Sequence, residues 1–188
     1  MRAFVALDLD AGSAHAIAAA AAAVRAASPP TWKASWVPPR SMHVTAQFLG
    51  ETDEAIAPAL GEALVAIARA SIAPPPAVAT LTAFPSEGRA RILVAELADT
   101  SGALGCIARA VAASTEPHGF AREARPYRPD VTLARLRVPR EVGPVIAASG
   151  VASLALGVAS LTLFRSDRVP AGPAYAPLAR AAFPSPRS

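Results

Sequence analysis

Two stretches of the chain share one short pattern, and this near-repeat constrains the fold more than any other feature. The stretch His43-Val-Thr-Ala-Gln-Phe-Leu-Gly50 is echoed by Asp130-Val-Thr-Leu-Ala-Arg-Leu-Arg137. Both stretches alternate as strands do, so the first residue and the threonine two places later share one face. Val44, Ala46 and Phe48 are then expected on the opposite face of the first strand. Two such strands can each offer a polar pair to one cleft.

A ring nitrogen beside a hydroxyl suits a small anionic ligand. The Thr45 hydroxyl can donate a hydrogen bond to a phosphoryl oxygen, while the His43 imidazole can take up or release a proton near neutral pH. A lone histidine or a threonine in a strand usually has a structural role. The functional assignment of His43 and Thr45 therefore rests on the motif that contains them. The repeated pair points to phosphoester chemistry.

The two motifs resemble those of a known family. His-x-Thr-x-x-Phe-Leu-Gly at residues 43–50 and Pro-x-x-Thr-Leu-Ala-Arg at residues 129–135 are similar to the signatures of the two-histidine (2H) phosphoesterases. Within these, the chain most resembles the bacterial RNA 2′,3′-cyclic phosphodiesterases, long called 2′-5′ RNA ligases. The likeness extends through residues 1–7, 36–39, 84–85, 163–166 and 172–175. It departs at one position, because Asp130 stands where the family has its second histidine.

The order of local patterns supports a duplicated architecture. Strands are expected at 2–9, 32–36, 42–49, 78–84, 91–97 and 131–138, and extended segments at 151–164 and 174–182. Helices are expected at 13–27 and 101–113, with a third running from an Asp53 N-cap to Ala70, and a proline-rich linker at 74–76. Strands and helices arranged twice predict an α+β fold with two pseudo-symmetric lobes, whose antiparallel sheets face a central cleft and whose helices lie outside. Residues 1–188 are expected to form one domain of two intimate lobes.

The resemblance also implies an activity and a set of site residues. The activity is hydrolysis of the terminal 2′,3′-cyclic phosphate of RNA to a 2′-phosphomonoester by metal-independent acid/base catalysis. His43 and Asp130 would act on opposite sides of phosphorus, and Thr45 and Thr132 would bind its nonbridging oxygens. Arg135 would help to hold the phosphate. Simple alternation places Arg135 out of phase with Thr132, so it needs a bulge, a twist or its long side chain to reach the cleft.

Asp130 alters what the resemblance implies. The reference pKa of aspartate is about 3.9 and that of histidine about 6.5, so Asp130 is expected to be anionic at neutral pH, fit as a base and poorly fit as an acid. Loss of a matched acid or base typically costs ~10²- to 10⁴-fold in rate. The favoured prediction is therefore a slower enzyme with Asp130 as base and His43 as acid. Two alternatives stay open: an inactive descendant that still binds nucleotides or RNA ends, and an engineered or erroneous residue 130.

The basic residues suggest an anionic partner. The formal net charge is +4, and Lys33 is the only lysine among 18 basic residues. Such a balance favours polyanions in general, although a GC-rich genome also replaces lysine with arginine. Several arginines lie around the second motif: Arg122, Arg125, Arg128, Arg135, Arg137 and Arg140. They either contact RNA or form a solvated face.

The remaining features limit location and cofactors. A single cysteine, Cys106, is typical of a reducing compartment, and the apolar stretch at 14–24 is too short to span a bilayer. A cytoplasmic protein without membrane association is expected. Because no Gly-rich phosphate loop or Cys/His cluster occurs, neither a cofactor nor a metal ion is expected. The expected partners are RNA ends or nucleotides with a cyclic phosphate, and the runner-up function is a noncatalytic module that binds them.

Overall fold

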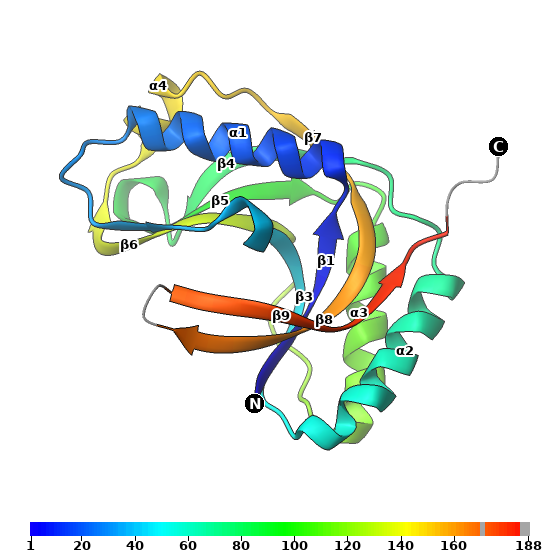
Figure 1. Cartoon of the computed structure of the whole chain (residues 1–188). Coiled ribbons are helices and arrows are strands. Elements are labelled where there is room, and N and C mark those ends of the chain that lie inside the picture. The colour runs from blue at the N-terminus through cyan, green and yellow to red at the C-terminus, as the bar shows by residue number, and fades with distance from the viewer. Residues whose placement is uncertain (170–171, 185–188) are drawn as a thin grey trace.

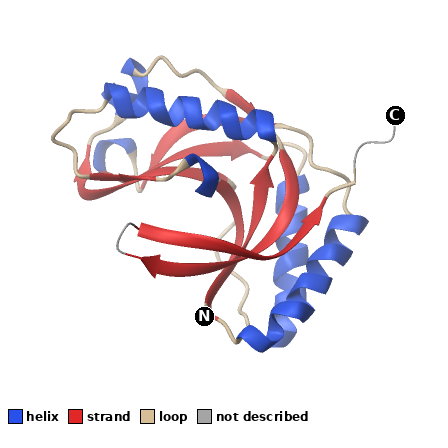
Figure 2. Cartoon of the chain, viewed as in Figure 1, coloured by secondary structure: helices blue, strands red, loops and turns tan. Residues whose placement is uncertain are grey.

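The strands form one strongly curved antiparallel sheet with helices on its outer side, as the computed structural model shows for residues 1–169 and 172–184 (Figure 1, Figure 2). The sheet has nine strands in the order β7-β4-β5-β6-β3-β1-β8-β9, and β2 pairs with β6. The strands are β1 (Arg2–Leu9), β2 (Ala34–Trp36), β3 (His43–Glu51), β4 (Ala77–Phe84), β5 (Ala90–Ala98), β6 (Asp130–Arg140), β7 (Leu154–Leu156), β8 (Val158–Val169) and β9 (Gly172–Ala182). The expected α+β class with antiparallel pairing is confirmed.

The two expected lobes are the two halves of this sheet. One half is β3-β1-β8-β9 and the other is β6-β5-β4-β7, so each motif strand is the innermost strand of its half. The halves are joined by pairing of Val44 with Val131, and both valines are fully buried. Strand curvature on either side of this junction turns the two halves toward each other.

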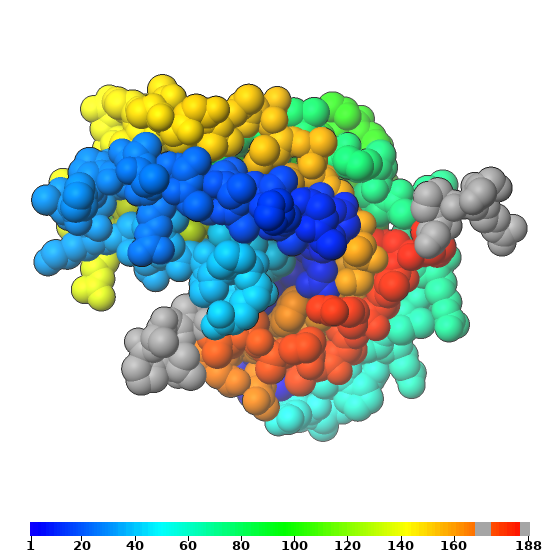
Figure 3. All heavy atoms as spheres, turned by 45° about the horizontal axis from the view of Figure 1, so that its top comes forward, coloured from blue at the N-terminus to red at the C-terminus, as the bar shows by residue number. Residues whose placement is uncertain are grey.

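The helices cover the outer side in a crossed arrangement. Helix α1 (Ala11–Ala27) follows β1 but packs against β7 and α4 (Gly143–Ala148), which belong to the other half (Figure 3). Helix α3 (Ala103–Thr115) follows β5 but packs against β3 and against α2 (Ala57–Ala70), which contacts β8 and β9. Each half therefore buries its aliphatic side chains under a helix connected to the other half. None of the helices in the described residues is long and apolar enough to cross a membrane.

Side-chain caps explain where two helical segments begin. The Asp10 carboxylate accepts a hydrogen bond from the Ser13 backbone N–H at 2.8 Å, so α1 begins at Ala11. The Asp53 carboxylate accepts from the Ala55 N–H at 3.0 Å and caps a short 3₁₀ turn, Glu54–Ile56, that leads directly into α2. The expected cap at Asp53 is present, but it caps this turn rather than α2 itself.

Two details of the C-terminal third differ from the sequence pattern. Helix α4 was not predicted, because it has only six residues and starts with glycine and proline. The extended segment expected over 151–164 is divided at Gly157, which lies between β7 and β8. The Gly157 N–H donates to the Ser13 hydroxyl at 2.8 Å, and a Cβ at this position would collide with the Asp10 carboxylate. Glycine lets the chain pass close to the start of α1.

Candidate active site

The two motifs meet at the centre of the sheet. Because β3 and β6 pair in antiparallel fashion at Val44 and Val131, counting one residue either way sets His43 beside Thr132 and Thr45 beside Asp130. In a regular antiparallel pair, diagonal neighbours such as His43 and Asp130 are roughly 7–8 Å apart. The near-repeat therefore forms a pseudo-twofold arrangement in which each threonine adjoins the leading residue of the other motif.

An extra residue follows the threonine in both motif strands. Along β6, Thr132 pairs with Val94 and Ala134 pairs with Leu93, so Leu133 is a β-bulge. Along β3, Thr45 pairs with Ala6 and Gln47 pairs with Val5, so Ala46 is the equivalent bulge. A bulge shifts the alternation by one residue. Beyond the bulge, the side chain of the residue three places after the threonine therefore points to the cleft side.

This shift settles the position of Arg135 and corrects that of Phe48. Arg135 lies on the same side as Thr132 and lines the cleft, through a bulge, which is one of the three possibilities that the sequence left open. Phe48 was expected with Val44 on the opposite face, and that expectation was wrong. Its side chain is 73% exposed and lines the cleft, whereas Gln47 points to the helices. Phe48 has the same place in the first motif as Arg135 has in the second, but only the pairing of each strand with its neighbour reveals the shared bulge.

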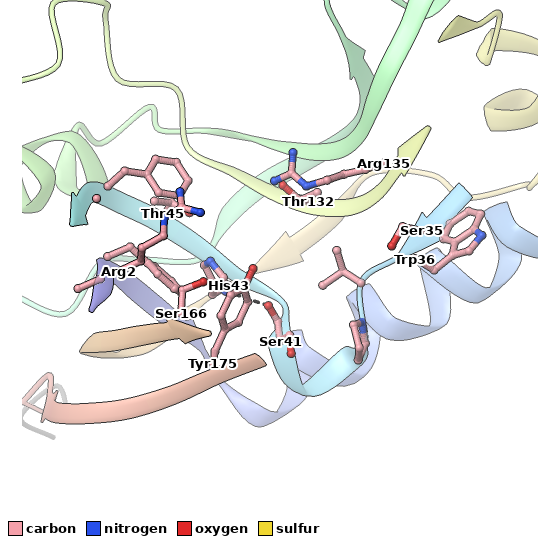
Figure 4. A pocket seen from close by; sticks show the side chains of 16 residues that line it. Arg2, Ser35, Trp36, Ser41, His43, Thr45, Thr132, Arg135, Ser166 and Tyr175 are labelled. Carbon is pink, nitrogen blue, oxygen red and sulfur yellow. Dashed lines mark hydrogen bonds between the residues drawn. The ribbon is translucent and has the colours of Figure 1, made fainter. Parts of the chain in front are cut away.

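A cleft of about 240 Å³ lies over the junction. Thr132 and Arg135 reach into it from β6, and His43, Tyr175 and Ser166 lie across from them (Figure 4). Thr45 is also part of its lining, and its backbone carbonyl accepts a hydrogen bond from the Tyr127 hydroxyl at 3.1 Å. Trp36, Phe4 and Phe48 add aromatic surface. Four of the expected site residues, His43, Thr45, Thr132 and Arg135, thus line one cleft.

His43 is held in one orientation. Its Nδ1 lies 2.8 Å from the Ser41 carbonyl oxygen, which can only accept, so Nδ1 carries a proton and Nε2 of the neutral ring has the lone pair. The ring stacks on Phe4 at 4.9 Å between centroids, and the Tyr175 ring meets it edge-on at 5.5 Å. Burial lowers the pKa of His43 below its usual value of 6.5, although the Ser41 hydrogen bond and the Asp8 charge act in the opposite direction. His43 is therefore mainly neutral at pH 7.

Asp8 supports His43 from the neighbouring strand. It pairs with His43 across β1 and β3, on the cleft side of the sheet. Its Oδ2 accepts hydrogen bonds from the hydroxyls of Ser160 at 2.7 Å and Thr162 at 2.6 Å, and lies 3.1 Å from the Arg180 Nε. Sequence reasoning did not select Asp8, because the register of β1 against β3, which the sequence alone does not give, places it opposite the motif histidine.

Asp130 lies beside the cleft and is not among the residues that line it. Its strand neighbours are Thr45 on β3 and Glu96 on β5. Burial, together with the Glu96 charge, raises the pKa of Asp130 to about 6, while Arg135, Arg128 and Thr132 oppose the increase. The sequence predicted an ordinary anionic carboxylate. In its folded environment this carboxyl group titrates close to the range of a histidine.

The arginines around the second motif divide into two groups. Arg122 pairs with Glu116, Arg125 with Glu123 and Arg128 with Glu96, at 2.7–3.1 Å. The Arg128 guanidinium also lies 4.9 Å from the centroid of the Phe84 ring. Among the described residues, no carboxylate lies within salt-bridge distance of the other group, Arg135, Arg137 and Arg140.

No group of three or more histidine, cysteine or acidic side chains gathers as a metal site in the part of the chain that the structure describes. The polar groups of the cleft are instead one imidazole, hydroxyls and guanidinium groups, which donate hydrogen bonds or carry positive charge. This arrangement can bind a phosphate and can place a proton carrier on it.

Known proteins are similar to this chain in sequence and in fold. Residues 7–94 match the family described as LigT like Phosphoesterase. An RNA 2′,3′-cyclic phosphodiesterase of Aeropyrum pernix is 31% identical over 108 residues, which make up 56% of this chain and 59% of that relative. The chain thus spans under two thirds of the length of the curated relative.

Solved structures match over almost the whole chain. The protein TT0787 of Thermus thermophilus is 27% identical, with a TM-score of 0.74 over 97% of this chain and 98% of that one. LigT of E. coli, solved in complex with 3′-AMP, is 22% identical, with a TM-score of 0.67 over 98% of each chain, and this likeness concerns the fold. The family match over residues 7–94 and the shared architecture make the chain similar to the LigT-like phosphoesterases.

Proposed function

We propose that the protein hydrolyses terminal 2′,3′-cyclic phosphates of RNA or nucleotides to 2′-phosphomonoesters, using His43 and Asp130 as proton carriers and no metal ion. The observation that carries the proposal is the crossing of the two motifs, with an oriented imidazole in a cleft of about 240 Å³ and a carboxyl of raised pKa beside that cleft. The cyclic phosphodiesterase named among its relatives supports the substrate class.

We assign His43 as the base, because its neutral ring has a free Nε2, and Asp130 as the acid, because its raised pKa leaves more of it protonated near pH 7 than an ordinary carboxyl. These roles are the reverse of those suggested by the sequence. Neutral His43 has a free Nε2 that can take a proton from the attacking water as its oxygen bonds to phosphorus. The bond from phosphorus to O3′ then breaks, and the protonated Asp130 carboxyl donates its proton to O3′. Thr45, Thr132 and Arg135 stabilise the nonbridging oxygens, on which negative charge develops. Proton exchange with solvent restores both groups.

The test is an assay of purified protein with adenosine 2′,3′-cyclic monophosphate, with and without EDTA, and with identification of the monoester. We expect a 2′-phosphate, formed at equal rates in both conditions. His43→Ala should abolish turnover, whereas Arg125→Ala, which removes an exposed arginine paired outside the cleft, should not change it. A 3′-phosphate product or strict dependence on added metal contradicts the proposal.

A substrate with a stable leaving group separates the two roles. Bis(4-nitrophenyl) phosphate releases a phenolate that needs no proton, so loss of the acid has little effect on its hydrolysis. Asp130→Asn should therefore retain hydrolysis of this ester while losing that of the cyclic nucleotide, and His43→Ala should lose both. The opposite pattern assigns the base to Asp130.

One observation favours a second function, a noncatalytic module that binds nucleotides or RNA ends. Asp130 is absent from the cleft lining although it occupies the second motif position. This function predicts tight binding of 2′- or 3′-AMP without turnover of any phosphodiester. Calorimetric titration beside the activity assay distinguishes it from the enzyme.

Three sequence-based predictions accompany the proposal. Residues 1–188 form one domain of two intimate halves, which the continuous sheet supports. Catalysis needs no cofactor. The protein works in the cytoplasm, where the free and exposed Cys106 stays reduced.

A further inference from the structure

The segment that leads into the second motif is held to the first motif strand at two points. The Tyr127 hydroxyl donates to the Thr45 carbonyl at 3.1 Å, and the Gln47 side-chain amide donates to the Ala121 carbonyl at 3.4 Å. Thr45 and Gln47 lie on either side of the bulge residue Ala46. The two contacts therefore join this segment to β3 at the point where the regular pairing of β3 is interrupted.

Tyr127 is the anchor of this segment. Between Phe120 and Pro129 it is the only residue that is not exposed, and its side chain packs against the core. Strands β3 and β6 pair at Val44 and Val131 before they separate. Beyond this bridge, the Tyr127 side chain connects β3 to the chain that leads into β6. One side chain thus bridges the two motifs just past the point where their strands separate.

The Tyr127 hydroxyl stays protonated in the pH range where the proposed enzyme works. Burial raises the pKa of Tyr127, and the negative charges of Asp130 and Asp99 act in the same direction. The Thr45 carbonyl can only accept, so the hydroxyl proton lies between the two oxygens. This contact therefore does not titrate where His43 and Asp130 do.

We propose that Tyr127 is a positioning residue for Thr45. By holding the Thr45 carbonyl, it fixes the backbone beside the bulge and keeps the Thr45 hydroxyl in the cleft, where this hydroxyl can donate to a nonbridging phosphate oxygen. This inference rests on the proposed function for the role of Thr45 as a phosphate ligand. Thr132, the equivalent threonine, lies on the other motif strand (Figure 4), and no hydrogen bond among the described residues joins its side chain to Tyr127. Tyr127 therefore supports one side of the pseudo-twofold site and not the other.

The test is a pair of double-mutant cycles measured by calorimetric titration of 2′-AMP. Tyr127→Phe keeps the ring and removes the hydroxyl, and it should lower the affinity roughly 2- to 10-fold, the effect of one hydrogen bond. In the Thr45→Val background, which has already lost the threonine hydroxyl, Tyr127→Phe should have no further effect. In the Thr132→Val background, Tyr127→Phe should lower the affinity by the same factor as in the parent protein.

A merely structural role gives a different result. General loosening of the fold weakens binding by the same factor in both backgrounds, and this outcome overturns the inference, as does an unchanged affinity in Tyr127→Phe. Incorporation of 4-aminophenylalanine in place of Tyr127 supplies an N–H donor at the same position and should restore the affinity. An affinity that stays low with this residue also overturns the inference. Urea unfolding shows whether each variant is folded.

These outcomes are separate from those of the proposed function, because the binding measurements require no turnover. If the wild-type protein hydrolyses no cyclic phosphate and the two cycles still differ as expected, the proposed function fails and the inference stands. If the wild-type protein is active and the two cycles agree, the inference fails and the proposed function stands.

Discussion

Phe48 and Arg135 occupy equivalent positions in the two halves of the sheet, each turned into the cleft by a bulge just after its motif threonine. The pseudo-twofold thus places an aromatic face on one side of the cleft and a guanidinium on the other. A nucleoside phosphate has the same asymmetry, with a flat base and a charged phosphate. The pair is suited to orient such a ligand.

Phe48→Ser should weaken nucleotide binding without unfolding the protein. The ring is 73% exposed, so its removal costs the core little. Stacking of a base on an aromatic ring contributes about 1–3 kcal/mol, so the affinity for 2′-AMP should fall roughly 5- to 150-fold. The affinity for inorganic phosphate, which has no base, should stay within twofold. A parallel loss for both ligands, measured by calorimetric titration, would show that Phe48 acts on the shape of the cleft instead.

Arg135→Ala should weaken the binding of both ligands, unlike Phe48→Ser. Its guanidinium lines the cleft, where we propose that it holds the phosphate, so both 2′-AMP and inorganic phosphate should bind more weakly, by about 1.5–3 kcal/mol for a charge-assisted hydrogen bond. Arg122→Ala is the matched control, because Arg122 is exposed but paired with Glu116. Equal affinities of the two variants would remove Arg135 from the phosphate site.

Asp8→Asn should lower the pKa of His43 further. The Asp8 charge favours the imidazolium, and without it the unneutralised Arg180 opposes protonation. Any acidic limb of the pH–rate profile due to His43 should then move to lower pH. An NMR titration of the imidazole measures the shift directly, with the rings of His15 and His118 as internal controls. A pKa that stays at the wild-type value contradicts electrostatic support by Asp8.

The near-repeat, together with proline and glycine breaks between the other segments, predicted most of the architecture. Alternation in both motifs located β3 and β6. Proline and glycine residues, which break regular structure, separated the remaining strands from the helices. Alternation alone misplaced Phe48, because a bulge depends on the pairing with a neighbouring strand and leaves no residue pattern of its own. The pKa of Asp130 was not predictable either, since it depends on burial and on Glu96, which is distant in sequence and adjacent in the sheet.

Thr115→Val should destabilise the fold by about 1–3 kcal/mol, because it leaves a buried acceptor without a donor. The Thr115 hydroxyl donates to Gln47 Oε1 at 2.8 Å, and this bond fixes α3 to the motif strand β3. Urea unfolding measures the change, with Ser114→Ala on the same helix as control. Adding Gln47→Leu to Thr115→Val should recover most of the loss, since neither partner then remains unsatisfied. A double variant less stable than Thr115→Val alone contradicts the pairing.

The raised pKa of Asp130 should affect the pH dependence of the stability as well as that of the activity. The native carboxyl binds its proton up to about pH 6, whereas its unperturbed pKa is 3.8. The native state therefore holds more protons than the unfolded state in this window, and this group's contribution to stability is lost as pH rises from about 4 to 6. Asp130→Asn should then be more stable than the parent at pH 7, by at most about 3 kcal/mol for a shift of this size.

Activity should follow the same titration. With Asp130 as the acid, the rate declines above about pH 6 as the carboxyl loses its proton. Asp130→His removes a negative charge beside the phosphate and supplies an imidazole, whose reference pKa of about 6.5 lies above the pKa of about 6 of Asp130; burial lowers the pKa of that imidazole and the Glu96 charge raises it. The alkaline limb should therefore move to higher pH, and turnover at pH 7.5 should increase, by up to ~10²-fold for a matched acid. His43→Ala in this background should abolish the gain. The measurement is kcat against pH for adenosine 2′,3′-cyclic monophosphate, and an alkaline limb that stays in place after Asp130→His removes residue 130 from the chemistry.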